Sequence, residues 1–191
     1  MNILLLLVLG YLVGSLPIAY LVARAWGANV FEVGTRNPGA ANVFRSVGRT
    51  AGIVVLVGDL AKAAAPVLVA RWLHEPSWLA LATGLAAMIG HWYPVFLRFR
   101  GGAGLATTIG VGYAILPVPA LLATIPGIVV LSLLHNTGIA AGVGFLVFFV
   151  VALIMHQPIL LALAISVLPA LALARERLLP TPGARRKQGQ T

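Results

Sequence analysis

The sequence predicts an all-α integral membrane protein with several membrane-spanning helices. Of its 191 residues, 60% are hydrophobic and only 9% are charged, whereas a soluble domain is roughly half apolar and a quarter charged. The apolar residues gather into long runs, and about 20 consecutive apolar residues suffice for a helix to cross the hydrocarbon core of a bilayer. The length of the chain indicates one compact domain.

Six apolar runs make up most of the chain. They cover residues 3–23, 51–73, 78–97, 104–134, 138–155 and 157–174. The first predicts a membrane helix and not a signal peptide, because it has neither a basic N-terminal region nor a small-residue cleavage site. The fourth is long for one span and short for two, and Pro117 and Pro119 interrupt it. It therefore predicts two short, tilted helices or a re-entrant hairpin.

The expected number of spans and the positive charges together predict the orientation. We expect about seven spans, or five spans plus a hairpin. Both counts of membrane crossings are odd, so the two termini are expected on opposite sides of the membrane. Placing the 24–50 loop in the cytoplasm puts eleven of the 13 lysine and arginine residues inside, as the positive-inside rule requires. Arg71 then lies outside and Lys62 within a span. We expect the N-terminus outside and the C-terminus inside.

The sequence divides into a membrane domain, residues 1–175, and a basic tail, residues 176–191. The tail contains proline and glycine and is expected to be disordered and to contact anionic headgroups. The net charge of +9 is therefore assigned to topology and lipid contact and not to nucleic acid. There is no cysteine to serve as a nucleophile, and the four histidines lack the spacing of metal ligands, so no metal site is expected.

The first polar segment that suggests chemistry is the loop GTRNPGAANVFR, residues 34–45. Asn37 and Gly39 favour turns, and Ala40 is small enough for backbone N–H groups to approach an anion. Arg45 lies where a helix is expected to begin, and a junction between a loop and a helix suits phosphate. The alternative is a solvated loop whose arginines only follow the topology rule.

The second segment is GDLAKA, residues 58–63, which lies within the second predicted span. Asp59 and Lys62 are three residues apart and so share one face of the helix, where they can pair. A charge at this depth is costly unless it is paired, so ionisable residues inside a membrane are candidates for function. A purely structural ion pair is the alternative.

The third segment is GHWYPVFLRFRGGAG, residues 90–104, where a span leaves the membrane. Gly101 and Gly102 can present bare backbone donors, with Arg98 and Arg100 beside them. For His91, which lies within the span, a hydrogen bond between helices is favoured over a role as a base.

In their order and spacing, these three segments resemble the motifs of the PlsY-type acyl-phosphate:glycerol-3-phosphate acyltransferases. The family patterns are approximately GSxNPGATNVxR, GDxxKG and GHxFPVFxxFKGGKG, and the resemblance covers the first 110 residues well. It implies transfer of a fatty acyl group from acyl phosphate to the 1-hydroxyl of glycerol 3-phosphate, which gives lysophosphatidate, at the cytoplasmic face of a bacterial inner membrane. It implies no cofactor, and its implied partners are membrane lipids and the enzyme that supplies acyl phosphate.

The resemblance also implies roles for residues at matching positions. Because an acyl phosphate is already activated, no enzyme nucleophile is needed, and catalysis would consist of positioning and charge stabilisation. The implied catalytic residues are Thr35, Arg45, Asp59 and Lys62. The implied substrate-binding residues are Asn37, Gly39, Ala40, Asn42, His91, Arg98, Arg100, Gly101 and Gly102.

The chain departs from the family patterns at several positions. Thr35 keeps the hydroxyl of the family's serine, but Ala41 replaces a threonine, Ala63 a glycine and Ala103 a lysine. The family's C-terminal pattern, approximately HRxNIxRL followed by Gly-Thr-Glu, has no clear match, and Glu176 is a poor substitute for its glutamate. A divergent member that acts as a lipid-binding or regulatory protein is therefore the alternative. A transporter is less favoured, because the ionisable residues gather at one face.

Overall fold

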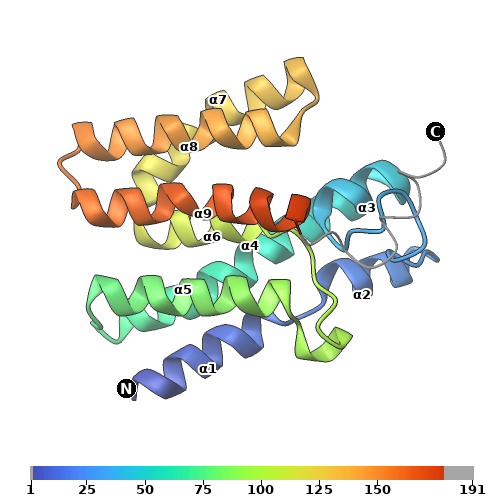
Figure 1. Ribbon diagram of the computed structural model, residues 1–191, viewed down its shortest axis with the longest axis horizontal. Helices are drawn as coiled ribbons and strands as arrows, with labels where there is room; N and C mark the ends of the chain where they lie inside the picture. The colour runs from blue at the N-terminus through green and yellow to red at the C-terminus, as the bar shows by residue number, and fades with distance from the viewer. Residues whose placement is uncertain (1, 179–191) are drawn as a thin grey trace.

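The computed structural model of the chain describes residues 2–178, and it confirms the predicted all-α membrane fold (Figure 1). The described elements are α1 (Ile3–Gly14), α2 (Ile18–Ala25), α3 (Ala40–Ser46), α4 (Arg49–Trp72), α5 (Ser77–Trp92), the short 3-10 helix η1 (Val95–Leu97), α6 (Leu105–Ile115), α7 (Pro117–Leu134), α8 (Thr137–Ile154) and α9 (Ile159–Leu178). Residues 176–178, which the sequence analysis placed in the tail, continue α9. Residues 179–191 lie outside the described residues.

Within residues 2–178, six helical stretches are long and apolar enough to cross a membrane. They are Ile3–Ala25, Arg49–Trp72, Ser77–Leu97, Pro117–Leu134, Thr137–Ile154 and Ile159–Glu176. The 104–134 run is divided as its prolines predicted, because α6 ends at Ile115 and α7 begins at Pro117. The division is unequal: α6 has 11 residues, about 16 Å of helix, against a hydrocarbon core of about 30 Å.

The first span is broken, which the sequence analysis did not predict. α1 ends at Gly14 and α2 begins at Ile18, and Pro17 between them has no amide hydrogen to donate to a continuous helix. The carbonyl of Leu16, in this break, accepts a hydrogen bond from Lys62 Nζ at 2.8 Å. The break therefore brings polar backbone of the first span against the charged pair of α4.

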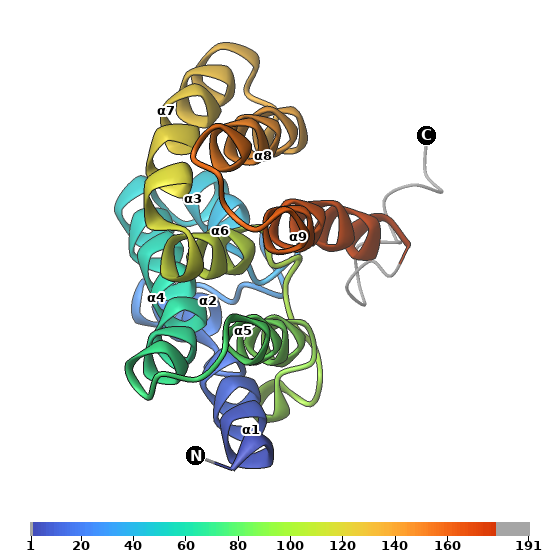
Figure 2. The same cartoon turned by 90° about the vertical axis from the view of Figure 1, so that its left-hand side faces the viewer.

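Glycines let the helices approach each other closely. A Cβ added to Gly14 of α1 would lie 2.0 Å from the carbonyl oxygen of Ala87 in α5, and one added to Gly10 would lie 2.6 Å from that of Thr83. Small residues have this role in membrane helix pairs, because lipid provides no hydrophobic drive for association. Figure 2 shows α5, α8 and α9 nearly end on, as members of one bundle.

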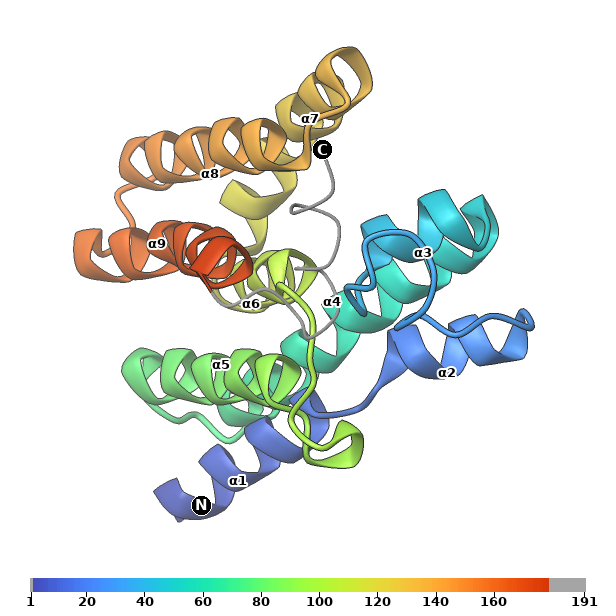
Figure 3. The same ribbon diagram turned by 45° about the vertical axis from the view of Figure 1, so that its right-hand side comes forward.

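The polar segments gather at one end of the bundle, as the topology prediction requires. The loop between α2 and α3, the segment between α5 and α6, and the C-terminal end of α9 all lie there (Figures 1 and 3). A small core of buried residues holds α2, this loop, α3 and the start of α4 together. It consists of Ala19, Ala23, Val30, Val43, Ala51 and Val55.

At the opposite end of the bundle, Arg71 stabilises the C-terminus of α6. Its Nη1 donates to the carbonyls of Ala114 at 2.5 Å and Ile115 at 2.9 Å. Those carbonyls belong to the last turn of α6 and have no partner within the helix. The single positive charge expected on the outer side therefore has a structural partner.

Candidate functional site

The charged pair of α4 is buried at the centre of the site. Lys62 Nζ lies 2.8 Å from Asp59 Oδ1, and the two side chains are 5% and 2% exposed. The same ammonium donates to the Leu16 carbonyl at 2.8 Å. The pairing predicted from the i, i+3 spacing is thus present, and the lysine also ties α4 to the break in the first span.

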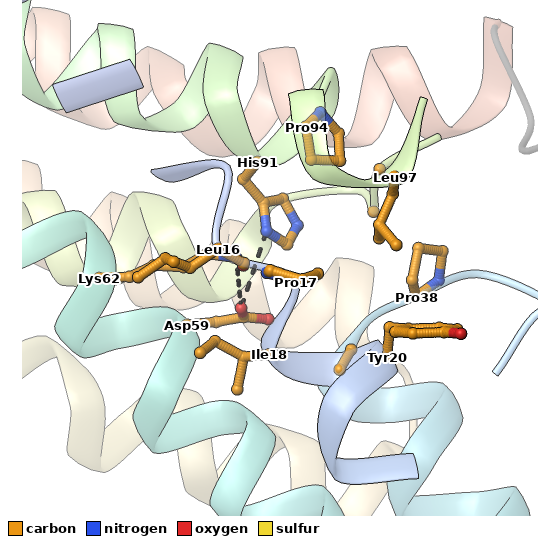
Figure 4. A pocket seen from close by; sticks show the side chains of 13 residues that line it. Leu16, Pro17, Ile18, Tyr20, Pro38, Asp59, Lys62, His91, Pro94 and Leu97 are labelled. Carbon is orange, nitrogen blue, oxygen red and sulfur yellow. Dashed lines mark hydrogen bonds and ion pairs between the residues drawn. The ribbon is translucent and has the colours of Figure 1, made fainter. Parts of the chain in front are cut away.

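His91, at the end of α5, faces the same carboxylate. Its Nδ1 lies 3.7 Å from Asp59 Oδ1, and the residue is 5% exposed. Figure 4 shows the side chains of Lys62 and His91 converging on Asp59. The three side chains line a small pocket with residues from the helix break, the 34–39 loop and the 94–102 segment. The other residues of its wall are Leu16, Pro17, Ile18, Ala19, Tyr20, Pro38, Pro94, Leu97, Gly101 and Gly102.

The first loop is held in shape by Asn42. Its side-chain oxygen accepts from the Thr35 amide at 2.9 Å, and its side-chain nitrogen donates to the Val33 carbonyl at 3.2 Å. Gly34 has a φ of +53°, and an added Cβ would collide with Asn42 and Ser46, so the tight turn requires glycine at this position. Asn42, predicted to bind substrate, is buried and shapes the loop from within.

The other predicted residues of this loop remain accessible. Thr35 and Arg45 are exposed. Arg45 was expected where a helix begins, but it lies in the last turn of α3, where its Nε donates to the Ala41 carbonyl at 3.1 Å. This bond fixes the base of the side chain, and among the described residues the two terminal nitrogens of its guanidinium have no partner. Asn37 donates to the Glu176 carboxylate at 3.2 Å, a contact between the first loop and α9 that the sequence did not predict. Gly39 precedes α3, and its N–H donates to the Asn37 carbonyl at 2.9 Å.

The second loop, residues 101–104, is folded onto Trp92. The indole N–H donates to the Ala103 carbonyl at 2.7 Å, and the Gly101 amide donates to the Trp92 carbonyl at 3.1 Å. The prediction that Gly101 and Gly102 both offer bare donors is therefore wrong for the Gly101 amide, which is occupied. In the described part of the chain, the amides of Gly102, Ala103 and Gly104 have no acceptor.

The two loops touch each other. A Cβ added to Gly102 would lie 2.5 Å from the Pro38 carbonyl oxygen and 2.8 Å from His91 Nε2. Because only hydrogen fits there, Gly102 permits the first loop, the second loop and the histidine to meet. Ala40, at the start of α3, adds a further amide without an acceptor among the described residues.

The arginines of the 94–102 segment, predicted to bind substrate, are both exposed. Arg98 has a φ of +52°, and its side chain has no hydrogen-bond, ion-pair or ring partner among the described residues. Arg100 is stacked over the ring of Phe31, with 5.1 Å between the guanidinium carbon and the ring centroid. This stacking joins the second loop to the 26–39 segment and leaves Arg100 at the rim of the site.

Sequence reasoning missed Arg175, which lies near the end of α9. Its Nη1 donates to the Gly102 carbonyl at 2.6 Å and its Nη2 to the Trp92 carbonyl at 2.9 Å. The guanidinium also lies over the rings of Trp92 and Tyr93. The available signal was weak: a single arginine at a helix end, which the topology rule already explained.

Comparison with known proteins agrees with these motifs. The family model for glycerol-3-phosphate acyltransferase matches residues 4–177. The chain is 50% identical over 113 residues to a glycerol-3-phosphate acyltransferase of Rubrobacter xylanophilus. This alignment covers 59% of this chain and 57% of the relative. The chain is 41% identical over 170 residues to one of Geobacter sulfurreducens, which covers 87% of each. The first alignment thus spans less than two thirds of the relative, and the second spans most of it.

The fold has a counterpart among solved structures. Crystal structures of PlsY, an integral membrane glycerol 3-phosphate acyltransferase, superpose with TM-scores of 0.83 for the glycerol 3-phosphate form and 0.80 for the lysophosphatidic acid form. Sequence identity is 31% and 30%, and each covers 93% of this chain and 89% of the other. The chain is therefore a multi-pass integral membrane protein that belongs to the glycerol-3-phosphate acyltransferase family.

Proposed function

We propose that this chain transfers a fatty acyl group from acyl phosphate to the 1-hydroxyl of glycerol 3-phosphate and so makes lysophosphatidate. The observation that carries the proposal is the meeting of two small-residue loops, with acceptor-free amides at Ala40, Gly102 and Ala103. Arg45 is an exposed cation on α3, and Lys62, which is paired with Asp59, lines the pocket together with Gly102. Such backbone donors and cations suit phosphate groups, and both substrates carry one.

The reaction needs no covalent enzyme intermediate. The 1-hydroxyl oxygen attacks the acyl carbonyl carbon, the new ester bond forms, and the bond between that carbon and the phosphate oxygen breaks. The hydroxyl proton leaves with the released phosphate, so that atoms and charge balance. The protein contributes orientation and donors for the negative charge that develops on the carbonyl oxygen and the leaving phosphate.

The proposed roles follow from where each group lies. Arg45, exposed in the last turn of α3, would bind a phosphate through its two terminal nitrogens, which have no partner among residues 2–178, and the hydroxyl of Thr35 would assist. The amides of the second loop would face the reacting carbonyl or the leaving phosphate. Asp59 and Lys62 would hold the pocket floor in shape and set its charge.

The location proposed for this chemistry is the cytoplasmic face of a bacterial inner membrane. The end of the bundle that carries both loops also carries the C-terminal ends of α2 and α9, together with α3 and η1 (Figure 1). The arginines on these elements are Arg24, Arg45, Arg98 and Arg175, and the positive-inside rule assigns them to the cytoplasm. A lipid-soluble acyl donor would reach the pocket from the bilayer, and glycerol 3-phosphate would reach it from the water. The proposed partners of the protein are membrane lipids and the enzyme that supplies acyl phosphate.

The direct test is turnover by the purified protein in lipid nanodiscs, with palmitoyl phosphate and radiolabelled glycerol 3-phosphate, scored for labelled lysophosphatidate. Arg45→Ala should lower kcat/KM about ten- to a hundredfold, since a charge-assisted hydrogen bond contributes about 1.5–3 kcal/mol. Arg49→Ala is the matched control, because Arg49 is also exposed, lies four residues away and has no partner in the described part of the chain.

Two results would contradict the proposal in different ways. Equal turnover by the Arg45→Ala and Arg49→Ala variants would reduce the first loop to a topology signal. Absence of lysophosphatidate with the unaltered protein, with glycerol 3-phosphate still bound, would favour the divergent member that binds lipid precursors without transferring the acyl group.

A further inference from the structure

Three carbonyl groups of the second loop, those of Gly102, Ala103 and Gly104, accept hydrogen bonds from protein side chains. The Gly102 carbonyl accepts from Arg175 at 2.6 Å, the Ala103 carbonyl from Trp92 at 2.7 Å, and the Gly104 carbonyl from the Thr107 hydroxyl at 2.6 Å. Each anchor fixes one peptide plane. Three consecutive planes are therefore held from the protein side.

A fixed carbonyl also fixes the direction of the next amide. In a planar trans peptide the N–H of a residue points opposite to the C=O of the residue before it, and the described residues contain no cis peptide bond. The Arg175 bond to the Gly102 carbonyl therefore directs the Ala103 N–H away from α9. The Trp92 bond to the Ala103 carbonyl directs the Gly104 N–H in the same manner, and neither amide has an acceptor among the described residues.

Arg175 is placed to do this with little freedom of its own. Two of its nitrogens bond to two carbonyls that are ten residues apart in the sequence, those of Trp92 and Gly102. The guanidinium carbon lies 5.9 Å from the Trp92 ring centroid and 5.3 Å from that of Tyr93. A planar fork can hold both carbonyls and stack on aromatic rings at once, whereas an ammonium is a point donor.

We propose that Arg175 is a positioning residue for acyl transfer: it clamps the Gly102–Ala103 peptide to the end of α5, so that the Ala103 amide is aimed at the charge of the phosphate-bearing substrates. This inference rests on the proposed function for its reaction. The proposal also assigns anion binding at position 103 to the backbone N–H. Alanine provides this N–H as well as lysine does.

The test uses full-length protein in nanodiscs, with Arg175→Lys, Arg175→Gln and Arg175→Ala compared with Arg49→Ala. Removing one preorganised oxyanion donor lowers kcat about 10²–10³-fold in enzymes, so a misdirected one should lower kcat/KM at least about tenfold. Lysine should not restore activity although it keeps the charge. Added methylguanidinium should restore part of the activity of Arg175→Ala, and methylammonium at the same concentration should not.

Hydrogen–deuterium exchange gives a readout that is independent of turnover. The peptide containing residues 99–106 should exchange faster in Arg175→Gln than in the unaltered protein, while peptides from α4 and α7 should not change. If the unaltered protein makes no lysophosphatidate, the proposed function fails and this exchange result alone decides whether the clamp exists.

Three outcomes would overturn the inference. The first is kcat/KM of Arg175→Lys and Arg175→Gln within threefold of the unaltered protein. The second is equal recovery with methylammonium and methylguanidinium, which would reduce the role of Arg175 to its charge. The third is unchanged exchange in residues 99–106. Where the alanine variant does not fold, the same rescue is measured on Arg175→Gln.

Discussion

Removing one partner of the buried pair in α4 should destabilise the protein much more than removing both. In Lys62→Met, the carboxylate of Asp59 stays buried at 2% exposure and loses the ammonium that lies 2.8 Å away. The Leu16 carbonyl in the break of the first span loses its donor in the same step. Breaking a buried pair from one side costs about 3–5 kcal/mol, because it leaves an uncompensated buried charge.

The corresponding shift in melting temperature is measurable. For a protein of this size, 1 kcal/mol corresponds to about 2–4 °C, so Lys62→Met should melt about 6–20 °C below the unaltered protein. The double variant Asp59→Leu with Lys62→Met removes both charges and fills the space with apolar atoms. It should recover most of the loss, because replacement of a buried ion pair by apolar residues is often close to neutral.

Thermal unfolding followed by tryptophan fluorescence in nanodiscs, with the acyl transfer assay on the same samples, gives both readouts. We expect the double variant to regain stability and not activity, because both residues line the pocket beside Gly101 and Gly102. Recovery of both would mean that the pair is only structural. Two results would refute the reasoning. One is a melting temperature of Lys62→Met equal to that of the unaltered protein, and the other is a decrease in melting temperature of the double variant equal to the sum of the decreases of the two single variants.

Two further predictions test the fold and the orientation. Gly14→Ala should lower the melting temperature by several degrees, because its Cβ would lie 2.0 Å from the Ala87 carbonyl oxygen. The control Gly142→Ala should be neutral or slightly stabilising, because nothing lies within 4 Å of its Cβ. Equal effects of the two variants would contradict the packing of α1 on α5. Reporter fusions after residue 48 and at the C-terminus should be cytoplasmic and one in the 74–77 turn should be external, and an external 24–50 loop would reverse the placement of the site.

The fold was predictable because a helix that crosses the membrane requires a long run of apolar residues. Long apolar runs fixed the positions of the spans, and Pro117 divided the longest run where expected. The break at Leu16–Pro17 was not predicted, because a single proline in a membrane helix is compatible with a kink as well as with a break. In the structure the Leu16 carbonyl in the break accepts a hydrogen bond from Lys62, a residue 46 positions away along the chain.

The site was predictable in part, for a similar reason. Each of the three motifs carries its own local chemistry, so Asp59 and Lys62 could be paired from their spacing alone. The contribution of α9 could not be found in that way, because Arg175 lies 73 residues from Gly102 along the chain and reaches it only through helix packing. A pattern match at the C-terminus fails here, yet the helix end still contacts both loops, through Arg175 and through Glu176.

These contacts change what the substitution at position 103 means. Of the cations near the second loop, Arg175 spends both terminal nitrogens on carbonyls and Arg100 is stacked on Phe31. Neither guanidinium is in a position to replace a lost lysine without breaking an existing contact. Lys62 also lines the pocket, but its ammonium is paired with Asp59. Binding of phosphate would then depend on the loop amides and on Arg45, whose terminal nitrogens have no partner in the described part of the chain. Arg45 should therefore be more important in this chain than in a relative that retains the lysine.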